Sequence, residues 1–461
     1  MSQNGDPVYQ EYEESEIIDD SVTSLLGDPD YSKATIIYPN SNLTRFDFKR
    51  SYTAIKIRFN LPETIKYPPL PVFMDKTITI YPLNGESIVT GTEFLSAQRI
   101  LHKALLRISE ESKITLSELY KKYYIKIVTG SYIPFRHNDD GTLAYRPFFS
   151  AILELQANRA KFKKLHGKGS ALERTYKDLG NMIYGKTVCG ISNKLNYDPR
   201  TKAMKSMIGG PLSNPILGSW ITGFVRALIA ELLNAVHDLG GEVSACTTDG
   251  FTCNIPDLET KILALYEKDG FDDSLLQDYR NSRDVLSRGT DPSGLEVKTS
   301  TIGLLQWSTR GQVSYNHTDP SLDNYNVPIC AMTGFQKFQF AHDTIKDEVI
   351  KAMTTNNKIF YLQKRLTGAR DFKQVSYISS LRLFRTVFDS KRAIILDNNS
   401  GLMLDTKPWF NIEEAFMTRK VMRKFSNTIY SSKFTRRDIL ATSYSSREET
   451  LKFFIRLVLG Y

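Results

Sequence analysis

The most constraining feature of this 461-residue sequence is a long apolar stretch from Leu217 to Leu239. Arg226, Glu231 and Asn234 interrupt it, which indicates an amphipathic helix packed in a protein rather than a bilayer span. The chain is hydrophobic at 41% of its positions and charged at 24%, which are ordinary globular proportions. At roughly 150 residues per domain, we expect about three domains and a sizeable core.

The spacing of the cysteines and the first residues of the chain indicate the cellular compartment. Cys189, Cys246, Cys253 and Cys330 form no Cys-x-x-Cys pair, which argues against a zinc module and a disulfide framework. Met1 is followed by polar residues and glycine, so no secretory signal is visible. We therefore expect a protein of a reducing compartment that is not secreted and has no membrane partner.

The charge is unevenly distributed along the chain. The net charge is +9, but residues 1–32 carry nine acidic side chains and no Lys or Arg, so the remainder carries +18. The acidic lead, 1–32, is predicted to be disordered. A basic body with 24 Tyr and 25 Phe suits a nucleic acid, because Lys and Arg release counterions from phosphates and aromatic rings stack on bases. A solvated basic face is the simpler alternative.

Local patterns predict a mixed α+β fold. Residues 35–38 and 44–48 alternate and are expected to be short strands. Four prolines exclude regular helix from 61–76. Residues 92–186 are expected to be mostly helical with a break at 130–147, strands are expected at 242–256 and 295–316, and helices from 340 onward.

The segment from Arg174 to Lys186 is the most informative. At helical spacing, one side carries a stripe expected to be buried, and the opposite side carries a cation, an amide and an aromatic ring that could meet a triphosphate, a base and a sugar. The stripe is Leu172, Tyr176, Leu179 and Ile183, and the polar side is Lys177, Asn181 and Tyr184. A surface lysine and a capping Asn before Gly185 are the structural alternative. Upstream, Arg159 and Lys163 share a helix face, which by itself also suits a solvated surface.

Two carboxylates occupy turns. Asp249-Gly250 lies between two β-rich arms and predicts a hairpin tip, although an isolated Asp-Gly often only makes the turn. Asp47 is expected at the end of a strand that turns into a helix from Tyr52. Carboxylates at strand ends bind metal or simply cap the next helix.

The order of these segments resembles motifs A, B and C of the family B DNA polymerases. Asp47-Phe-x-x-x-Tyr52 looks like motif A, Lys177-x-x-x-Asn181-x-x-Tyr184-Gly185 like motif B, and Thr247-Thr-Asp249-Gly like a divergent motif C. Further matches are Arg159-x-x-x-Lys163 on the first fingers helix, Arg310-Gly-Gln312 in place of Lys-x-Tyr, and Thr333-Gly-Phe335 at the entry to the thumb. The resemblance runs from about residue 35 to the end.

The resemblance implies a right-hand polymerase, with an antiparallel palm sheet plus helices, helical fingers and a mostly helical thumb. The expected parts are palm at 33–60 and 187–337, an insertion at 61–147, fingers at 148–186 and thumb at 338–461. The Pro-rich start of the insertion and Lys407-Pro408-Trp409 are similar to the protein-primed branch of phages, adenoviruses and linear plasmids. Only 46 residues precede Asp47, so a proofreading exonuclease is expected on a separate subunit.

The resemblance also implies the chemistry and its residues. Asp47, Asp249 and the carbonyl of Phe48 would hold two Mg²⁺ ions, for which Mn²⁺ can substitute. Phe48, Tyr52, Arg159, Lys163, Lys177, Asn181 and Tyr184 would contact the deoxynucleoside triphosphate, with Tyr52 excluding a 2′-hydroxyl. Gly185, Arg310, Arg419, Lys420, Arg423 and Lys424 would contact primer-template DNA. A terminal protein primer is a further expected partner, and the cytoplasm or nucleus of a host cell is the expected location.

Two departures from the family pattern leave alternatives open. Thr247 stands where motif C usually has its first Asp, and Gln312 replaces a Tyr. A catalytically impaired, polymerase-like DNA-binding subunit of a replication complex is therefore the main alternative. An RNA-templated or RNA-making palm enzyme is the second, and Tyr52 argues against it.

Overall fold

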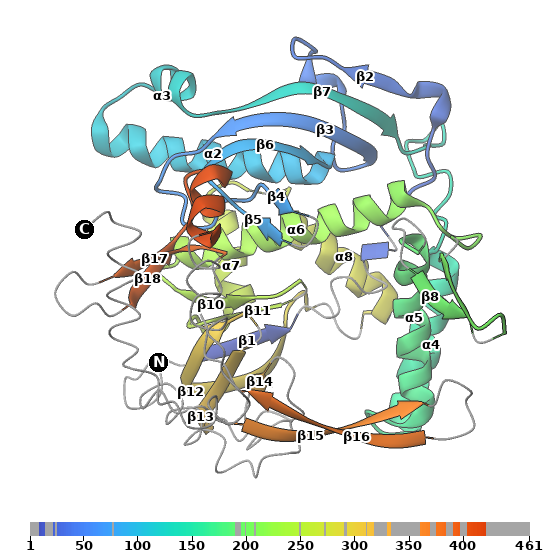
Figure 1. The fold of residues 1–461 in the computed structure, drawn as a ribbon. Coiled ribbons are helices and arrows are strands. Elements are labelled where there is room, and N and C mark those ends of the chain that lie inside the picture. The colour runs from blue at the N-terminus through green and yellow to red at the C-terminus, as the bar shows by residue number, and fades with distance from the viewer. Residues whose placement is uncertain are drawn as a thin grey trace. The chain divides into compact units, whose positions relative to one another are not determined.

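The structure is a computed structural model, in which the chain forms two compact units (Figure 1). The larger unit comprises Glu11–Val72 and Leu83–Val297, and the smaller unit comprises Met1–Gln10, Phe73–Pro82 and Lys298–Tyr461. The structure describes residues 9–13, 22–23, 25–75, 78–189, 195–198, 200–206, 209–248, 250–271, 273–289, 293–309, 311–317, 330–332, 360–368, 375–383, 391–396 and 403–420.

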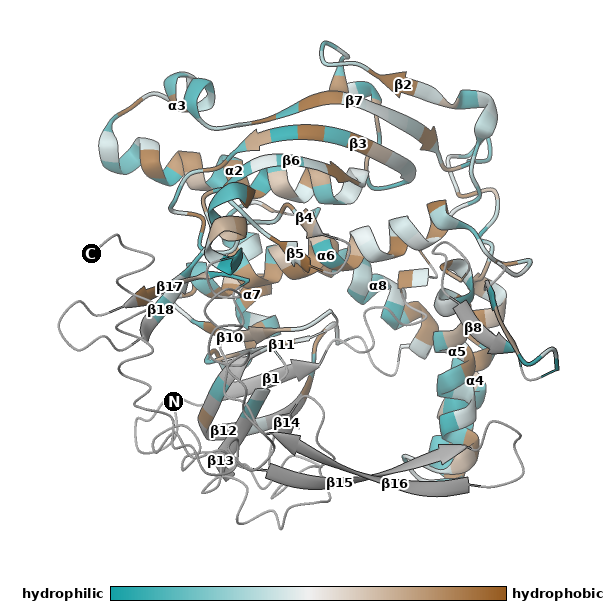
Figure 2. Ribbon diagram, viewed as in Figure 1, coloured by the Kyte–Doolittle hydropathy of each residue, from teal (hydrophilic) through white to brown (hydrophobic). Residues whose placement is uncertain are grey.

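A four-stranded antiparallel sheet in the order β2-β7-β3-β6 forms one layer of the larger unit. The strands are β2 (Thr35–Ile37), β3 (Ser51–Asn60), β6 (Asn84–Val89) and β7 (Tyr124–Pro134). β3 pairs with β6 on one side and with β7 along its whole length on the other. Ser51, Tyr52 and Thr53 are all buried, and from Thr53 to Phe59 buried and exposed residues alternate along β3, whose hydropathy also alternates (Figure 2). That period of two is the pattern of a strand with one face on a core.

Helices α2 (Gly91–Ser112) and α6 (Pro215–Asp238) pack against each other and against β3. A capping box formed by Thr90 and Glu93 starts α2, and Glu93 also accepts a 2.7 Å hydrogen bond from Nε of Arg226 on α6. A Cβ atom on Gly223 would lie 2.2 Å from Oγ1 of Thr90. Glycine at this position therefore permits the close crossing of the two helices.

Helix α6 forms the centre of the core of the larger unit. Asn214 caps its first turn, and Pro215 occupies the first helical position. Within the described part of the chain, α6 passes the length and composition test for crossing a membrane, but 72% of its apolar window is buried inside the protein. The structure therefore agrees with the core helix expected from the sequence.

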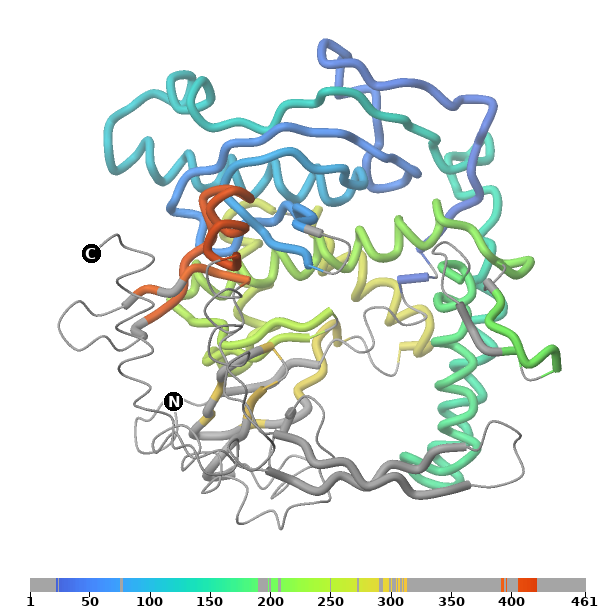
Figure 3. Tube along the Cα trace, in the orientation of Figure 1, coloured from blue at the N-terminus to red at the C-terminus, as the bar shows by residue number. Residues whose placement is uncertain are grey.

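The remaining elements of the larger unit surround α6 or extend from it. Helices α7 (Leu258–Lys268) and α8 (Leu275–Ser287) pack on α6, and β10 (Val243–Cys246) pairs with β11 (Gly250–Cys253) in an antiparallel hairpin. Helices α4 (Phe149–His166) and α5 (Ala171–Thr187) run side by side (Figure 3). Shorter elements are the 3-10 turns Tyr31–Lys33 and Leu43–Arg45, α3 (Leu116–Lys122), β8 (Leu195–Asp198) and β9 (Ala203–Ser206).

The described part of the smaller unit is mostly strand. β12 (Glu296–Ser308), whose first residues belong to the larger unit, pairs with β13 (Gly311–His317), which pairs with β14 (Cys330–Met332). β15 (Phe360–Gly368) pairs with β16 (Val375–Leu383), and β17 (Ala393–Leu396) with β18 (Met403–Lys407). β4 (Val72–Asp75) and β5 (Ile78–Ile80) form a two-stranded sheet, β1 (Tyr9–Glu13) is the first strand of the chain, and 412–420 is helical.

Several expectations from the sequence are confirmed. Strand β2 covers the expected strand at 35–38, no regular helix occurs in the described residues of 61–76, and hairpins occur at 242–256 and 295–316. Helices α2, α4, α5 and α6 were also expected.

Other expectations are wrong. The helix expected from Tyr52 is strand β3, and β7 occupies a segment expected to be helical, because both segments alternate with a period of two. Residues 43–45 form a 3-10 turn where a strand was expected. Strands β15 to β18 occur where helices were expected after residue 340. Within the acidic lead expected to be disordered, Val22 and Leu26 are buried in the core, because burial removes their apolar side chains from water.

Candidate functional site

Asp47 lies in the turn that leads into β3. Its Oδ1 atom accepts hydrogen bonds of 3.0 Å from the backbone N–H groups of both Lys49 and Arg50, and its own N–H donates to the hydroxyl of Tyr132. Oδ2 lies 4.0 Å from Nη1 of Arg50. The side chain is 49% exposed. One carboxylate oxygen is therefore fixed by the backbone of the turn, while the group as a whole is accessible from outside.

Phe48 and Tyr52, the other expected residues of this segment, are buried. A Cβ atom on Gly91 would lie 2.5 Å from the carbonyl oxygen of Phe48, so the start of α2 covers this carbonyl. Tyr52 is 2% exposed, and its hydroxyl donates a 2.7 Å hydrogen bond to the carbonyl of Gly27. Burial raises the pKa of Tyr52, so its phenol stays a neutral donor. A role against a nucleotide sugar would require Tyr52 to leave this hydrogen bond.

Thr247 closes the β10–β11 hairpin. Its N–H donates a 2.7 Å hydrogen bond to the carbonyl of Gly250, and its Oγ1 donates to the same oxygen at 3.1 Å. The residue in place of the usual first Asp of motif C therefore has a structural role in the turn. Asp249 lies outside the described residues, as do Arg310, Arg423 and Lys424.

The helix pair α4–α5 carries the residues expected to bind the nucleotide. Nε of Arg159 on α4 donates a 3.0 Å hydrogen bond to Oε1 of Glu173 on α5, and the N–H of Gly169 donates to the other carboxylate oxygen at 3.0 Å. Phe162 stacks on Tyr176 with ring centroids 5.3 Å apart. Lys163 and Asn181 are exposed, and Lys177 and Tyr184 are half-buried. The pair is therefore joined by one buried ion pair and one aromatic contact.

The stripe expected to be buried on α5 is wrong for two of its four residues. Leu172 is 45% exposed and Leu179 is 40% exposed, whereas Tyr176 and Ile183 are half-buried and Tyr176 stacks on Phe162 of α4. The buried residues of the helix are Glu173, Gly180 and Thr187, and the ion pair of Glu173 with Arg159 lies on that side. Lys177 follows Glu173 by one helical turn, so the expected nucleotide face borders the packed face.

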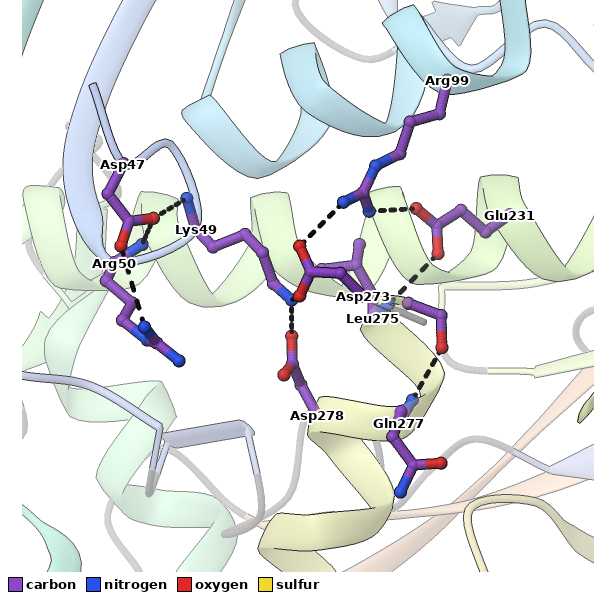
Figure 4. Close-up of polar contacts among 10 residues, drawn as sticks. Asp47, Lys49, Arg50, Arg99, Glu231, Asp273, Leu275, Gln277 and Asp278 are labelled. Carbon is purple, nitrogen blue, oxygen red and sulfur yellow. Dashed lines mark hydrogen bonds and ion pairs between the residues drawn. The ribbon is translucent and has the colours of Figure 1, made fainter. Parts of the chain in front are cut away.

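A charged cluster beside Asp47 was missed by the sequence reasoning (Figure 4). Nζ of Lys49 lies 2.5 Å from Oδ1 of Asp273 and also pairs with Asp278 on α8. Nη2 of Arg99 on α2 lies 2.9 Å from Oδ2 of Asp273, and its Nη1 lies 3.7 Å from Oε1 of Glu231 on α6. Burial raises the pKa of Glu231 to about 7, although Arg99 opposes this shift.

The same face of α2 continues this cluster with further cations at helical spacing. Lys103 lies 2.8 Å from Asp238 of α6 and 2.5 Å from Asp269, and Arg107 pairs with Asp238. Cations at 99, 103 and 107 opposite acids at 231 and 238 are a sequence signal that could have found the packing of α2 on α6.

A cavity of about 280 Å³ lies beside the Asp47 turn. Phe135, Trp220 and Phe224 provide buried aromatic surface, and Arg50 and Arg146 provide cations. The other lining residues are Leu25, Lys49, Leu143, Phe149, Asp278, Asn281, Ser282 and Val285. Aromatic surface beside cations suits an anionic ligand that carries a planar ring.

Among the described residues of this turn, Asp47 is the one whose side chain could bind a metal ion. A carboxylate oxygen is the hard ligand that Mg²⁺ prefers, so Asp47 fits one position of a magnesium site. No group of three or more His, Cys, Asp or Glu side chains that could hold a metal occurs in the described part of the chain. Arg419 and Lys420, expected to contact DNA, lie at the end of the helical segment 412–420, half-buried and exposed respectively.

Comparison with known proteins places this arrangement in context. No protein-family model matches the chain. A stretch of 384 residues, 81% of the chain, is 26% identical to the primer-independent DNA polymerase PolB of Escherichia coli. The resemblance to the family B DNA polymerases is confirmed. The chain spans 39% of the length of PolB. A solved structure of phi29 DNA polymerase complexed with primer-template DNA is similar, with 12% identity, a TM-score of 0.42, and coverage of 82% of this chain and 58% of the phi29 chain.

Proposed function

We propose that this chain is a DNA-directed DNA polymerase that adds deoxynucleotides to a 3′-hydroxyl on a DNA template. The observation that carries the proposal is the identity with PolB, which extends over 81% of the chain and so exceeds any single motif. The accessible carboxylate of Asp47 and the cationic, aromatic cavity beside it support a nucleotide ligand at this position.

In this proposal the parts of the right hand follow the sequence boundaries. Residues 33–60 and 187–337 form the palm, 148–186 the fingers and 338–461 the thumb, with 61–147 as the insertion of the protein-primed branch. The packed pair α4–α5, which carries Arg159, Lys163, Lys177, Asn181 and Tyr184, supports the assignment of the fingers. Gly185 supports a close approach by DNA, because an added Cβ atom would meet nothing within 4 Å in this chain, and glycine inside a helix costs about 1 kcal/mol.

Two divalent cations, Mg²⁺ or Mn²⁺, would lower the pKa of the primer 3′-hydroxyl and neutralise the departing pyrophosphate. Asp47 and Asp249 would hold them, and the Phe48 carbonyl could join them only if the start of α2, which covers it, moved away. The backbone N–H groups of Lys49 and Arg50 would keep Oδ1 of Asp47 oriented, which leaves Oδ2 as the adaptable oxygen. Arg50 would have to yield its position near Oδ2.

The chain's own side chains would do the rest of the positioning. Arg159, Lys163 and Lys177 would hold the phosphates, since transfer of this type depends on positioning and charge stabilisation. Asn181 and Tyr184 would contact the nascent base pair. Arg310, Arg419, Lys420, Arg423 and Lys424 would bind phosphates of the primer-template. Proofreading by a separate subunit, priming by a terminal protein, and a location in the cytoplasm or nucleus of a host cell belong to the same proposal.

The test is metal-dependent extension of a labelled primer on a DNA template. The parental chain should extend the primer with Mg²⁺, and Asp47→Asn should reduce incorporation by at least about a hundredfold while leaving DNA binding intact. Asp139→Asn, in an exposed turn, is the matched control and should behave as the parent.

The same assay distinguishes the alternatives. DNA binding without extension by the parental chain, with either metal, would favour a catalytically impaired DNA-binding subunit. Extension that prefers ribonucleotides or an RNA template would favour the RNA-related enzyme.

A further inference from the structure

We propose that Lys49 is a positioning residue for the Asp47 carboxylate, acting through its ion pairs with Asp273 and Asp278. This proposal rests on the proposed role of Asp47 as a metal ligand. Lys49 is only 12% exposed, and its ammonium lies between two carboxylates from a segment more than 220 residues later in the chain. Its stem therefore connects the Asp47 turn to the start of α8.

The turn couples the backbone of Lys49 to the orientation of the Asp47 carboxylate. The N–H of Lys49 is one of the two donors to Oδ1 of Asp47, so a shift of the Lys49 backbone moves this carboxylate. Oγ of Ser51 also donates to the backbone carbonyl of Asp47 at 2.6 Å, which closes the turn from the other side. The orientation of the carboxylate thus depends on where the Lys49 side chain is anchored.

Asp273 and the start of α8, which hold the Lys49 amine, are themselves bonded to two core helices, α2 and α6. Arg99 of α2 holds Asp273, and Ser274, the next residue, caps α8 by accepting the N–H of Gln277 at 3.1 Å. The N–H of Leu275 donates to Oε2 of the buried Glu231 on α6. Figure 4 shows the amine of Lys49 between Asp273 and Asp278, with Arg99 on the other side of Asp273. Glu231 contacts both Arg99 and the N–H of Leu275 in the first turn of α8.

Stability alone does not account for a lysine here. The Lys49 ammonium loses most of its hydration, while the Asp273 side chain is 69% exposed and its charge is screened by water, so the net contribution of the pair to folding is small. The effect of the ion pairs on geometry is large, because an amine held between two carboxylates has little conformational freedom. Groups that orient a metal ligand without touching the metal change metal affinity or activity by about 10- to 100-fold when removed.

The experiment compares Lys49→Met with Lys66→Met. Lys66 is a matched control because its side chain is 16% exposed and pairs at 2.6 Å with an acid of the same unit, Glu242. Two quantities are measured in the complex with primer-template DNA. These are Mn²⁺ affinity, from the electron paramagnetic resonance of free Mn²⁺, and the Mg²⁺ concentration that gives half-maximal extension.

Lys49→Met should weaken Mn²⁺ binding and raise the half-saturating Mg²⁺ concentration by about tenfold, with kcat recovering at high metal concentration. The KM for deoxynucleotide and the affinity for DNA should stay unchanged, and Lys66→Met should leave metal dependence unchanged. Asp278→Asn, which preserves the sequence of the turn, should shift metal dependence in the same direction and serves as the test should Lys49→Met fail to fold.

Unchanged metal dependence in folded Lys49→Met, or an increased nucleotide KM in place of a metal effect, would overturn the proposal. In the second case Lys49 would contact phosphate directly. Failure of the proposed function has a different signature. The parental chain would then neither bind Mn²⁺ in an Asp47-dependent manner nor extend a primer.

Discussion

Nε of Arg159 donates a 3.0 Å hydrogen bond to Oε1 of Glu173, which joins the two helices of the proposed fingers. The guanidinium expected to bind a triphosphate is thus already oriented by a carboxylate. Burial would raise the pKa of Glu173, but Arg159 and the N–H of Gly169 hold it below its usual value. Glu173 is therefore ionised at neutral pH and fixes Arg159 before any nucleotide arrives.

Replacing Glu173 with Gln should raise the KM for deoxynucleotide by roughly three- to tenfold, because a charge-assisted hydrogen bond worth ~1 kcal/mol or more is weakened and Arg159 loses its orientation. Steady-state extension at varied nucleotide concentration measures this effect. Glu154→Gln, an exposed site on α4, is the control. A lower KM in Glu173→Gln would mean that Glu173 competes with the triphosphate for Arg159.

Two substitutions of Tyr52 distinguish a structural role of this residue from a role in sugar selection. Tyr52→Phe removes only the hydroxyl that binds the Gly27 carbonyl, so it should lower stability by about 1 kcal/mol and leave sugar discrimination unchanged. Tyr52→Val should raise the relative use of ribonucleotides, at a cost of about 3 kcal/mol for the lost ring in the core. Thermal melting and the ratio of kcat/KM for the two sugars measure both. Unchanged discrimination in Tyr52→Val would remove Tyr52 from sugar selection.

Thr247→Val should retain activity within about tenfold. The variant loses the hydrogen bond from Oγ1 to the Gly250 carbonyl, worth about 1 kcal/mol, but keeps the stronger closure by the backbone N–H. Primer extension and melting temperature report the two effects, with Thr248→Val at the exposed neighbour as control. Complete inactivity of a folded Thr247→Val would show that the hydroxyl is needed for chemistry.

The raised pKa of Glu231 predicts that the stability of the protein depends on pH. Its native pKa near 7 exceeds its usual value of 4.5 because burial disfavours the charged form. The native state therefore binds an extra proton, and the stabilisation is complete below pH 4.5 and is lost as pH rises through about 7. Glu231→Gln should match the parent near pH 4 and exceed it at pH 8 by up to about 3 kcal/mol, measured by denaturant unfolding.

Glu86→Gln is the control for this titration. Hydrogen bonds from Arg58 and Lys56 hold the pKa of that exposed carboxyl below its usual value, so its neutral variant should show no gain at pH 8. A Glu231→Gln variant less stable than the parent at pH 8 would mean that the pair with Arg99 outweighs the cost of burial.

Local periodicity was sufficient for part of the fold. The apolar run of α6 and the hairpin of β10 and β11 depend on residues close in sequence, and both are confirmed. The helix expected from Tyr52 was wrong because buried and exposed residues alternate from Thr53 to Phe59, which is the pattern of a strand. The expected buried side of α5 was wrong at Leu172 and Leu179, because the contact with α4 includes the ion pair of Glu173 with Arg159 beside the stacking of Tyr176 on Phe162.

Part of the candidate site could also be predicted from residues close in sequence, and part could not. Asp47 was predicted from its motif, and the structure shows how the turn orients its carboxylate, while its role as a metal ligand stays a prediction. The contact of Lys49 with Asp273 could not be predicted, because the two residues are 224 positions apart and only the tertiary fold brings them together. The roles of Lys163, Lys177 and Asn181 stay predictions, since they depend on a bound nucleotide.

The cations of α2 show that formal charge and electrostatic potential differ in this protein. Arg99, Lys103 and Arg107 all count toward the +9 net charge, yet each lies against an acid of the same unit. Beyond about 8 Å at physiological ionic strength, such pairs present almost no field to an approaching polyanion. The exposed Lys161, Lys163 and Lys164 of α4 present theirs directly to solvent. The rate at which the proposed DNA partner is captured by diffusion should therefore depend on those three lysines far more than on the paired cations of α2.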